Sequence, residues 1–395
     1  MIPGKLKRLF KGRTERHAAG MHRRCVSLQP DGASRGNVLL SYVIDPFLLG
    51  PGAAISDDHT HHWESYQIAR TFLRHGFAVD VISYLNPSFR IRKDYRYFIS
   101  ARTNLVEIAR NLNPDCVIVS HLDTAHWVSS NHAAYTRLQA LKDRRHLTIK
   151  SSLKLIEPNM AIEHAHLATI LGNEYTIDTY RYAGKPIYRI PISTTATYDW
   201  NAAKNFDHCR KNYLWFGSSG FVHKGLDLVL DAFTRMPECH LTVCCPLDKE
   251  KGFLAAYHRE LFETPNIHPA GWTDVNSAKF REIADSCAGL VYPSCAEGGG
   301  GSAITCMHAG IIPVLSREAS VDIDEDCGRV LDSCSVGEIV DTVRKLSALP
   351  GETLERLARN AWERARATHT RERFAQAYDE FVSRILLQEF PGGAR

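Results

Sequence analysis

The sequence lacks the features of a membrane-spanning, disulfide-linked or zinc-binding protein. Its longest apolar runs, such as NVLLSYVI and PDCVIVS, have the length of strands and fall well short of the roughly 20 residues that a membrane span requires. Its 11 cysteines are scattered, and no CxxC pair occurs among them. This pattern favours reduced, buried thiols in a cytoplasmic protein, so neither a transmembrane helix nor a bound metal is expected.

The sequence also has little net charge, and most of the surplus lies at one end. The net charge is +4, yet residues 1–36 carry nine Lys and Arg against Glu15 and Asp31. Leu6, Leu9 and Phe10 stand at helical spacing among these cations. Two interpretations follow: a solvated, poorly ordered arm, or a short amphipathic helix on an anionic membrane surface, which would make the protein peripheral on the inner face of a membrane. No nucleic-acid partner is expected.

From Asn37 onward, strand-like and helix-like segments alternate. Residues 37–44 and 77–84 have the pattern of buried strands, and residues 63–76 between them place apolar side chains on one helical face. The alternation weakens before residue 205 and then restarts. An α/β fold with two doubly wound, mainly parallel sheets facing a central cleft is therefore predicted. The predicted divisions are a basic arm (1–36), two Rossmann-like domains (37–204 and 205–368) and a C-terminal helix with its tail (369–395).

Two loops of the second domain are suited to binding phosphate. The first, after the strand-like residues 213–217, contains Lys224 and the small residues Gly217, Ser218, Ser219 and Gly220. The second places four glycines between Glu297 and a predicted helix, namely Gly298, Gly299, Gly300 and Gly301. Bare N–H groups beside a helix N-terminus favour an anion, and lysine supplies a compact positive charge. A mobile surface turn is the alternative interpretation of the glycines. No GxxxxGK[ST] motif is present, so this is not a Walker-type site.

The combination of these loops resembles a known family. A glycine loop and the pair "KG" precede one predicted helix, and the later segment PSCAEGGGGSAITCMHAGIIPV has the pattern PSxxEGxGxxxxxxMxxGxxPV. This combination is similar to the retaining GT-B glycosyltransferases of the "glycosyl transferases group 1" family (family 4-like). The match covers roughly residues 213–345. The resemblance implies a GT-B fold with a C-terminal helix that crosses back to the first domain. It also implies sugar transfer from a nucleotide-sugar donor to a glycan or lipid-linked acceptor, with retention and without a metal or other cofactor.

The resemblance also implies roles for single residues. Glu297 corresponds to a glutamate that accepts hydrogen bonds from donor-sugar hydroxyls, Lys224 to a lysine that neutralises the diphosphate, and the glycines with Ser302 to diphosphate-binding N–H groups. Two departures stand out. Thr305 occupies the position of a second glutamate that holds the ribose, and Ser218 and Ser219 stand where an arginine usually accompanies the lysine.

The first domain, on the acceptor side, offers less specific candidates. His121 and His126 flank Asp123 after a strand-like run, where the family often places a histidine that meets the donor sugar. Acceptor-side candidates follow two other predicted strands: His61, His62, Glu64, Asn173 and Glu174. The run DDHTHHWE invites a metal interpretation, but the start of a helix explains it better.

Three functions remain open from the sequence. The first is a glycosyltransferase that builds a surface polysaccharide or glycolipid. The second is a nucleotide-sugar epimerase or hydrolase of GT-B shape, although no additional acid/base carboxylates can be located for it. The third is a non-catalytic subunit that binds a nucleotide sugar, which the departures at Thr305 and in the first loop make conceivable.

Overall fold

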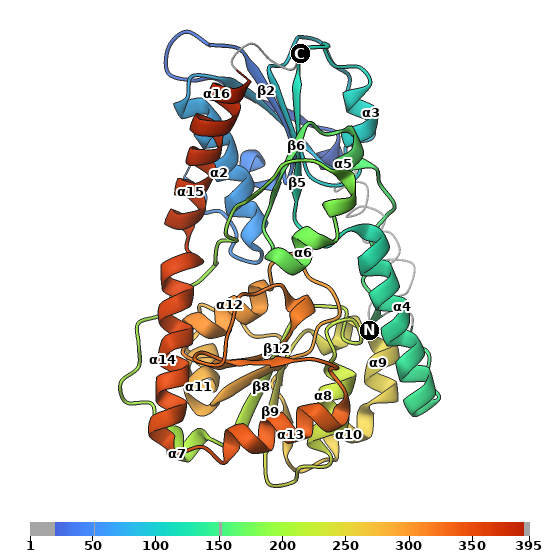
Figure 1. The fold of residues 1–395 in the computed structure, drawn as a ribbon, viewed down its shortest axis with the longest axis vertical. Coiled ribbons are helices and arrows are strands. Elements are labelled where there is room, and N and C mark those ends of the chain that lie inside the picture. Colours follow the sequence, from blue (N-terminus) through green and yellow to red (C-terminus); the bar gives the residue numbers. More distant parts are fainter. Residues whose placement is uncertain (1–19, 51, 150–151, 391–395) are drawn as a thin grey trace, which may run out of the picture.

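A computed structural model describes residues 20–50, 52–149 and 152–390 of the chain. Its elements form two α/β domains, each built around one sheet, and the two follow one another along the long axis of the molecule (Figure 1). In these ranges no helix combines the length and the apolarity needed to cross a membrane. Residues 1–19, which carry most of the predicted basic arm and its amphipathic segment, lie outside the described residues.

The first domain contains a seven-stranded sheet in the order β1-β3-β2-β4-β5-β6-β7. Its strands are β1 (Cys25–Leu28), β2 (Asn37–Tyr42), β3 (Ala78–Ser83), β4 (Tyr97–Ser100), β5 (Val117–Leu122), β6 (Leu167–Ile170) and β7 (Ile187–Arg189). Every neighbouring pair is parallel except β1, which runs antiparallel to β3 at the edge. Because β1 belongs to this sheet, the prediction of an arm over residues 1–36 is wrong for the segment 25–28.

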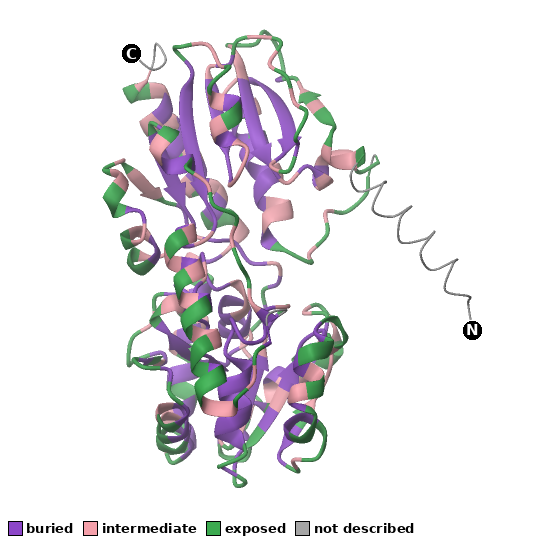
Figure 2. Ribbon diagram, turned by 90° about the vertical axis from the view of Figure 1, so that its right-hand side faces the viewer, coloured by how far each residue is buried: buried purple, intermediate pink, exposed green. Residues whose placement is uncertain are grey.

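Buried parallel strands account for the long apolar runs of this half. Strands β3, β4 and β5 are buried along their whole length, as expected for a sheet with helices on both faces (Figure 2). The helices of this domain are α2 (Thr60–Arg74), α3 (Leu105–Ala109), α4 (Trp127–Arg145), α5 (Ala161–His164) and α6 (Glu174–Asp178). Helix α2 buries Ile68, Ala69 and Phe72 against the sheet, which explains its apolar face in the sequence.

The second domain contains a six-stranded parallel sheet in the order β10-β9-β8-β11-β12-β13. Its strands are β8 (Asn212–Phe216), β9 (His240–Cys244), β10 (Ile267–Pro269), β11 (Gly289–Tyr292), β12 (Ile312–Ser316) and β13 (Arg329–Leu331). Its helices are α7 (Phe206–Cys209), α8 (Leu226–Phe233), α9 (Lys251–Ala256), α10 (His258–Phe262), α11 (Ala278–Ser286), α12 (Gly301–His308), α13 (Val336–Ser347) and α14 (Gly351–Thr368). Strands β8 and β11 are neighbours, so the loops that follow them lie side by side at one edge.

The C-terminal helices connect the two domains. Helix α14 covers the second sheet, and α15 (Arg371–Glu380) continues upward to pack against α2 of the first domain (Figure 1). A π-helical turn (Phe381–Leu386) and α16 (Leu387–Glu389) follow, and the Tyr97 hydroxyl donates a hydrogen bond to the Leu386 carbonyl at 3.1 Å. The prediction that the C-terminal helix returns to the first domain is confirmed.

The long helix α4 was not predicted from the sequence. It starts at the carboxyl end of β5 and runs down beside α8 and α9 of the second domain (Figure 1). Only Ser130, Ala134 and Leu141 of its 19 residues are buried, so its sequence has little apolar periodicity. The helix thus belongs to the first domain by connection while its last turns contact the second.

Candidate functional site

A cleft of about 1000 Å³ lies between the domains at the carboxyl ends of both sheets. The second domain contributes Lys224, Glu297 and the four glycines after Glu297 to its lining, and the first domain contributes Arg102 and Asp123. Open α/β sheets bind ligands at this edge because the loops after parallel strands converge there. The two loops selected from the sequence both belong to the second domain, and they face residues of the first domain across this one cleft.

Glu297 is held as an ionised carboxylate in the wall of this cleft. Its Oε1 atom accepts hydrogen bonds from Lys224 Nζ at 3.2 Å, Tyr292 Oη at 2.7 Å and Ser294 Oγ at 2.9 Å. Burial alone would raise the pKa of Glu297, but the charges of Lys224 and Lys154 and these donors hold that pKa well below its usual range. The contacts recorded among the described residues engage Oε1, so Oε2 is the oxygen that remains for a hydroxyl of a ligand.

Lys224 is almost completely buried, and its amine lies beside the Glu297 carboxylate. It lies between β8 and α8, and its Nζ also donates to the Tyr292 hydroxyl at 2.7 Å. A Cβ on Gly217 would lie 3.3 Å from Lys224 Cδ, so the absence of a side chain there leaves room for the lysine stem. Gly225, with φ +74°, then turns the chain into α8. The "KG" pair thus delivers a cation to the cleft and starts a helix.

The first glycine loop differs from the predicted phosphate cradle. The N–H of Gly217 donates to the Cys244 carbonyl, and the N–H groups of Gly220 and Phe221 donate to the buried carboxylate of Glu250. Gly217, Ser218 and Ser219 line the cleft, but Gly220 does not. The prediction is therefore wrong for the N–H groups of Gly217 and Gly220, because a carbonyl and an internal carboxylate already occupy them.

The second glycine loop lines the cleft as predicted. Two of its positions require glycine, each for a different physical reason. Gly300 has φ +58° and precedes the first residue of α12, a backbone conformation that side chains other than glycine adopt with strain. A Cβ on Gly298 would lie 2.6 Å from the Thr124 nitrogen of the first domain. This loop therefore lets the two domains approach at backbone distance beside Glu297.

The close approach at Gly298 leads to a stability prediction. Gly298→Ala is expected to lower the free energy of unfolding by about 1–3 kcal/mol, because the new methyl group displaces the backbone of Asp123 and Thr124. Gly301→Ala is the matched control, since a Cβ there meets no heavy atom closer than 4.0 Å. Thermal unfolding of both variants measures the difference. Equal melting temperatures would contradict the backbone contact between the domains.

Thr305 lines the cleft one turn into α12, but its hydroxyl proton is already used. Thr305 Oγ1 donates to the Gly301 carbonyl at 2.9 Å, so its oxygen is available to a ligand only as an acceptor. Ser302 also lines the cleft. A carboxylate at position 305 would accept from two ribose hydroxyls, whereas this threonine can offer one weaker, neutral contact.

The structure does not place His121 or His126 at the cleft. His121 lies within β5, fully buried, and its Nδ1 contacts Thr169 Oγ1 at 2.8 Å; burial lowers its pKa to about 4. His126 caps α4, and its Nε2 contacts the Tyr182 hydroxyl at 2.9 Å. The structure therefore leaves both predicted donor-sugar histidines outside the cleft lining, because His121 lies within β5, which extends to Leu122, and His126 is the N-cap of α4.

A charged cluster takes the place of those histidines. Asp123 is the first residue after β5, and both of its oxygens accept from the Arg102 guanidinium at 2.9–3.1 Å. Burial would raise the pKa of Asp123, but Arg102 lowers it to about 2. His61 Nδ1 lies 3.5 Å from Asp123 Oδ2, and the His59 and His61 rings contact one another at a tilt of 56°, with their centroids 4.0 Å apart. Arg102 was missed from the sequence, where a single arginine in a loop carries no signal.

Of the five acceptor-side candidates, only His61 lines the cleft. Glu64 is fully buried and accepts from the N–H and hydroxyl of Ser193, and burial raises its pKa to about 7. Asn173 caps α6 and its N–H donates to Ser320 Oγ across the domain boundary. Glu174 is exposed and lies 3.6 Å from Arg181, and His62, on α2, is not part of the cleft lining. The other four are therefore structural or surface residues.

One further cation of the lining, Lys154, was not predicted. It comes from the loop after α4, and the nearby charge of Lys224 together with burial lowers its pKa to about 8. Over the part of the chain that the structure describes, no group of three or more His, Cys, Asp or Glu is arranged to hold a metal ion. The charges that face the cleft thus come from side chains of both domains.

Several solved structures are similar to this chain over most of its length. Sucrose-phosphate synthase from Thermosynechococcus elongatus superposes with a TM-score of 0.61 at 15% identity, covering 91% of this chain and 99% of its own. HepE from Anabaena, in complex with UDP and glucose, superposes with a TM-score of 0.55 at 13% identity, covering 89% and 100%. TarM matches with a TM-score of 0.51 at 11% identity, over 73% of this chain and 54% of its own.

No protein-family model matches the chain, and comparison with curated protein sequences gives no match. At 11–15% identity the structural similarity establishes the fold and not the activity. With one seven-stranded and one six-stranded sheet facing a common cleft, this chain has the GT-B fold.

Proposed function

We propose that this protein is a glycosyltransferase that moves a sugar from a nucleoside-diphosphate donor to an acceptor hydroxyl with retention of the anomeric configuration. The observation that carries the proposal is the placement of Glu297, an ionised carboxylate bonded to the buried Lys224, in a cleft between two domains. A carboxylate suits sugar hydroxyls, and an amine suits a diphosphate. Structurally similar HepE was solved with UDP and glucose, which supports a donor of this kind.

In the proposed reaction, the bond between the anomeric carbon and the diphosphate oxygen breaks, the acceptor oxygen forms the new bond to that carbon, and the acceptor proton passes to the departing diphosphate. Negative charge grows on the departing diphosphate, and Lys224, Ser219 and the N–H groups at the start of α12 stabilise it. Preorganised electrostatic stabilisation of this kind contributes about 3–4 kcal/mol per donor group in a dry site. Side chains would then do the work of a metal ion, and we expect activity to persist in EDTA.

The acceptor enters from the first domain in this proposal. Arg102, Asp123 and His61 line that side of the cleft, and polar groups of this kind suit a hydroxylated acceptor such as a glycan. A lipid-linked glycan and a membrane contact through the basic N-terminal residues are the finer parts of the proposal. They correspond to synthesis of a surface polysaccharide or glycolipid at the inner face of a membrane.

A panel of nucleotide sugars tests the proposal. UDP-, GDP- and ADP-linked hexoses are added in thermal unfolding, where a ligand at about 100 times its Kd stabilises the fold by about 2.7 kcal/mol. The donor that binds is then incubated with glycan acceptors, and NMR of the product reports the anomeric configuration. Binding without turnover would favour the non-catalytic subunit, which the weak ribose contact of Thr305 makes a specific second candidate. Absence of binding by every nucleotide sugar would refute both.

Lys224→Ala is expected to weaken the binding of the nucleoside diphosphate at least tenfold, because it removes one charge-assisted contact to phosphate. Lys345→Ala, on the exposed face of α13, is the matched control and is expected to bind like the wild type. Isothermal titration with UDP, GDP and ADP measures both. Equal affinity of the two variants would place the phosphate site elsewhere.

A further inference from the structure

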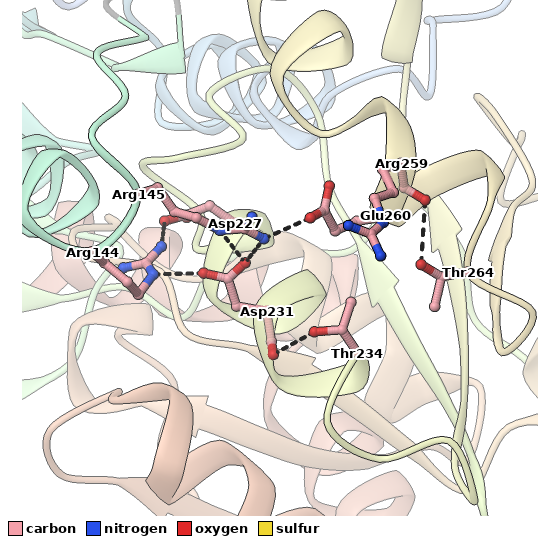
Figure 3. A network of polar contacts seen from close by, with 8 residues as sticks. All are labelled: Arg144, Arg145, Asp227, Asp231, Thr234, Arg259, Glu260 and Thr264. Carbon is pink, nitrogen blue, oxygen red and sulfur yellow. Dashed lines mark hydrogen bonds and ion pairs between the residues drawn. The ribbon is translucent and has the colours of Figure 1, made fainter.

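The last turns of α4 are fixed to the second domain by a network of ion pairs (Figure 3). Arg144 donates to Asp227 and Asp231, each at 2.6 Å, and Arg145 donates to Asp231 at 2.9 Å and to Glu260 at 2.8 Å. Asp227 and Asp231 lie on α8, the helix that follows Lys224 directly. The end of α4 therefore keeps a constant position relative to the loop that carries Lys224.

The chain after α4 continues along the same loop. We call residues 152–156 the strap. The Ser152 carbonyl accepts from the His223 N–H at 3.1 Å, and the Ser152 hydroxyl donates to the Glu250 carboxylate, which also accepts from the N–H groups of Gly220 and Phe221. Glu250 thereby ties the strap to the first glycine loop. The strap lines the cleft from Leu153 to Ile156.

Lys154 of the strap lies over the first glycine loop. A Cβ on Gly220 would be 2.7 Å from Lys154 Cγ and 3.0 Å from its Cδ, so any side chain at position 220 would displace the lysine stem. Gly220 thus makes room for Lys154, whereas Gly217 makes room for the Trp215 ring, at 2.9 Å, and for Lys224 beside it. Lys154, Lys224 and Glu297 line the same cleft, and both lysine charges lower the pKa of that carboxyl.

Among the described residues, no carboxylate forms an ion pair or a hydrogen bond with Lys154, although the charge of Glu297 acts on it. Glu297 is hydrogen-bonded to Lys224, and the Glu250 carboxylate is taken by two N–H groups and Ser152. The charge of Lys224 opposes that of Lys154, and this is the first reason that the pKa of Lys154 falls to about 8. Lys224 is buried and Lys154 is exposed, so solvent offsets part of this repulsion, and an anion bound between the two amines would remove the rest.

We propose that Lys154, supplied by the first domain, is the second cation of the diphosphate site and replaces the arginine that the family resemblance leads one to expect in the first loop. This inference rests on the proposed function. Lys224 and Glu297 together carry no net charge, so an anionic diphosphate requires the additional positive charge of Lys154. The strap supplies that charge from a position fixed by Ser152 and the α4 network.

Three variants and one readout test this assignment. Isothermal titration measures the affinity of wild type, Lys154→Ala, Lys154→Arg and Lys249→Ala for UDP, GDP and ADP and for the matching nucleosides. Lys249 is, like Lys154, an exposed lysine that lines the same cleft, so it controls for the general charge of the region. We expect Lys154→Ala to bind the diphosphate about 10- to 100-fold more weakly, since one charge-assisted contact is lost, with the nucleoside unchanged. Lys249→Ala is expected to bind like the wild type.

The pH dependence gives a second signature. The charged and titratable groups around Lys154 are Lys224, Glu297, Glu250, Arg102, His59 and His223. His223 is neutral above pH 7 because burial lowers its pKa to about 4. As pH rises from 7.5 to 9.5, Lys154 loses its proton in the free protein, and wild-type affinity for the diphosphate is expected to fall about tenfold. Lys154→Arg keeps its charge over this range and is expected to show a much smaller decrease.

The outcomes separate this inference from the proposed function. If the wild type binds one of the diphosphates and Lys154→Ala binds it equally well, the assignment of Lys154 is wrong and the proposed function stands. If Lys154→Ala weakens the diphosphate and its nucleoside alike, Lys154 only supports the local structure and the assignment is again wrong. If the wild type binds none of the three diphosphates, both the assignment and the proposed function are overturned.

Discussion

Glu297→Gln is expected to lower the rate of sugar transfer at least 100-fold, while the affinity for the nucleoside diphosphate stays the same or increases. Glutamine keeps the shape of the side chain and can still accept from Tyr292 and Ser294, but it removes the negative charge. Without that charge the donor sugar loses its strongest hydroxyl acceptor and the developing positive charge at the anomeric carbon loses its counter-charge. Lys224 meanwhile loses the carboxylate with which it is paired, and Lys154 loses a nearby negative charge, so both amines become more available to phosphate.

Initial rates of diphosphate release from the donor selected in the binding panel, with titration of the free diphosphate, measure the two effects separately. Ser294→Ala is the matched control, because it removes one neutral hydrogen bond to the same Oε1 atom and leaves the charge in place. Its rate is expected to fall by less than about tenfold. Turnover of Glu297→Gln close to that of the wild type would remove this carboxylate from the mechanism.

Asp231→Ala is expected to cost about 3 kcal/mol of the free energy of unfolding, the largest stability effect that we predict for a single substitution here. Asp231 is 4% exposed and accepts from the guanidinium groups of both Arg144 and Arg145 (Figure 3). Its removal leaves two partly buried cations with one carboxylate each. The carboxylates that remain, Asp227 and Glu260, cannot compensate because each already accepts from one of the arginines.

Chemical denaturation followed by tryptophan fluorescence measures this loss. Asp332→Ala is the control: Asp332 pairs with Arg317 at 2.8 Å in the same domain, but both side chains are more than half exposed. An exposed pair of this kind contributes less than about 1 kcal/mol. Equal destabilisation by the two variants would mean that the α4 network behaves as a surface network. In that case it would not fix the strap.

The parts of the site that could be predicted lie within single strand–loop–helix units. Lys224 and Glu297 each follow a buried strand and precede a helix, and both units are readable from apolar runs and glycines. Their meeting also follows from the sequence pattern, since loops after parallel strands of one sheet share an edge. The structure adds that β8 and β11 are direct neighbours, which brings the amine within 3.2 Å of the carboxylate.

The sequence-based predictions failed at two kinds of position. In one, the exact end of a strand decides whether a side chain reaches the cleft; in the other, a residue distant in the sequence is the hydrogen-bond partner. His121 was placed after β5, but the strand continues through Leu122 and buries the ring, so Asp123 is the residue that reaches the cleft. The N–H groups of the first glycine loop were assigned to phosphate, yet Glu250, 30 residues away in the chain, accepts from Gly220. Neither the strand end nor this partner is specified by local pattern.

The sequence by itself determined the two-domain α/β architecture and the paired loops of the second domain, because apolar periodicity, glycine and strand-to-helix transitions are local properties of the chain. Only the tertiary structure decided which cations complete the site. Arg102 and Lys154 both line the cleft from the first domain. Arg102 is held there by Asp123, and Lys154 lies on the strap that follows α4. Helix α4 has few buried residues, so no apolar pattern in the sequence predicts it. Such contacts depend on how two domains are packed against one another, and no spacing within either domain encodes them.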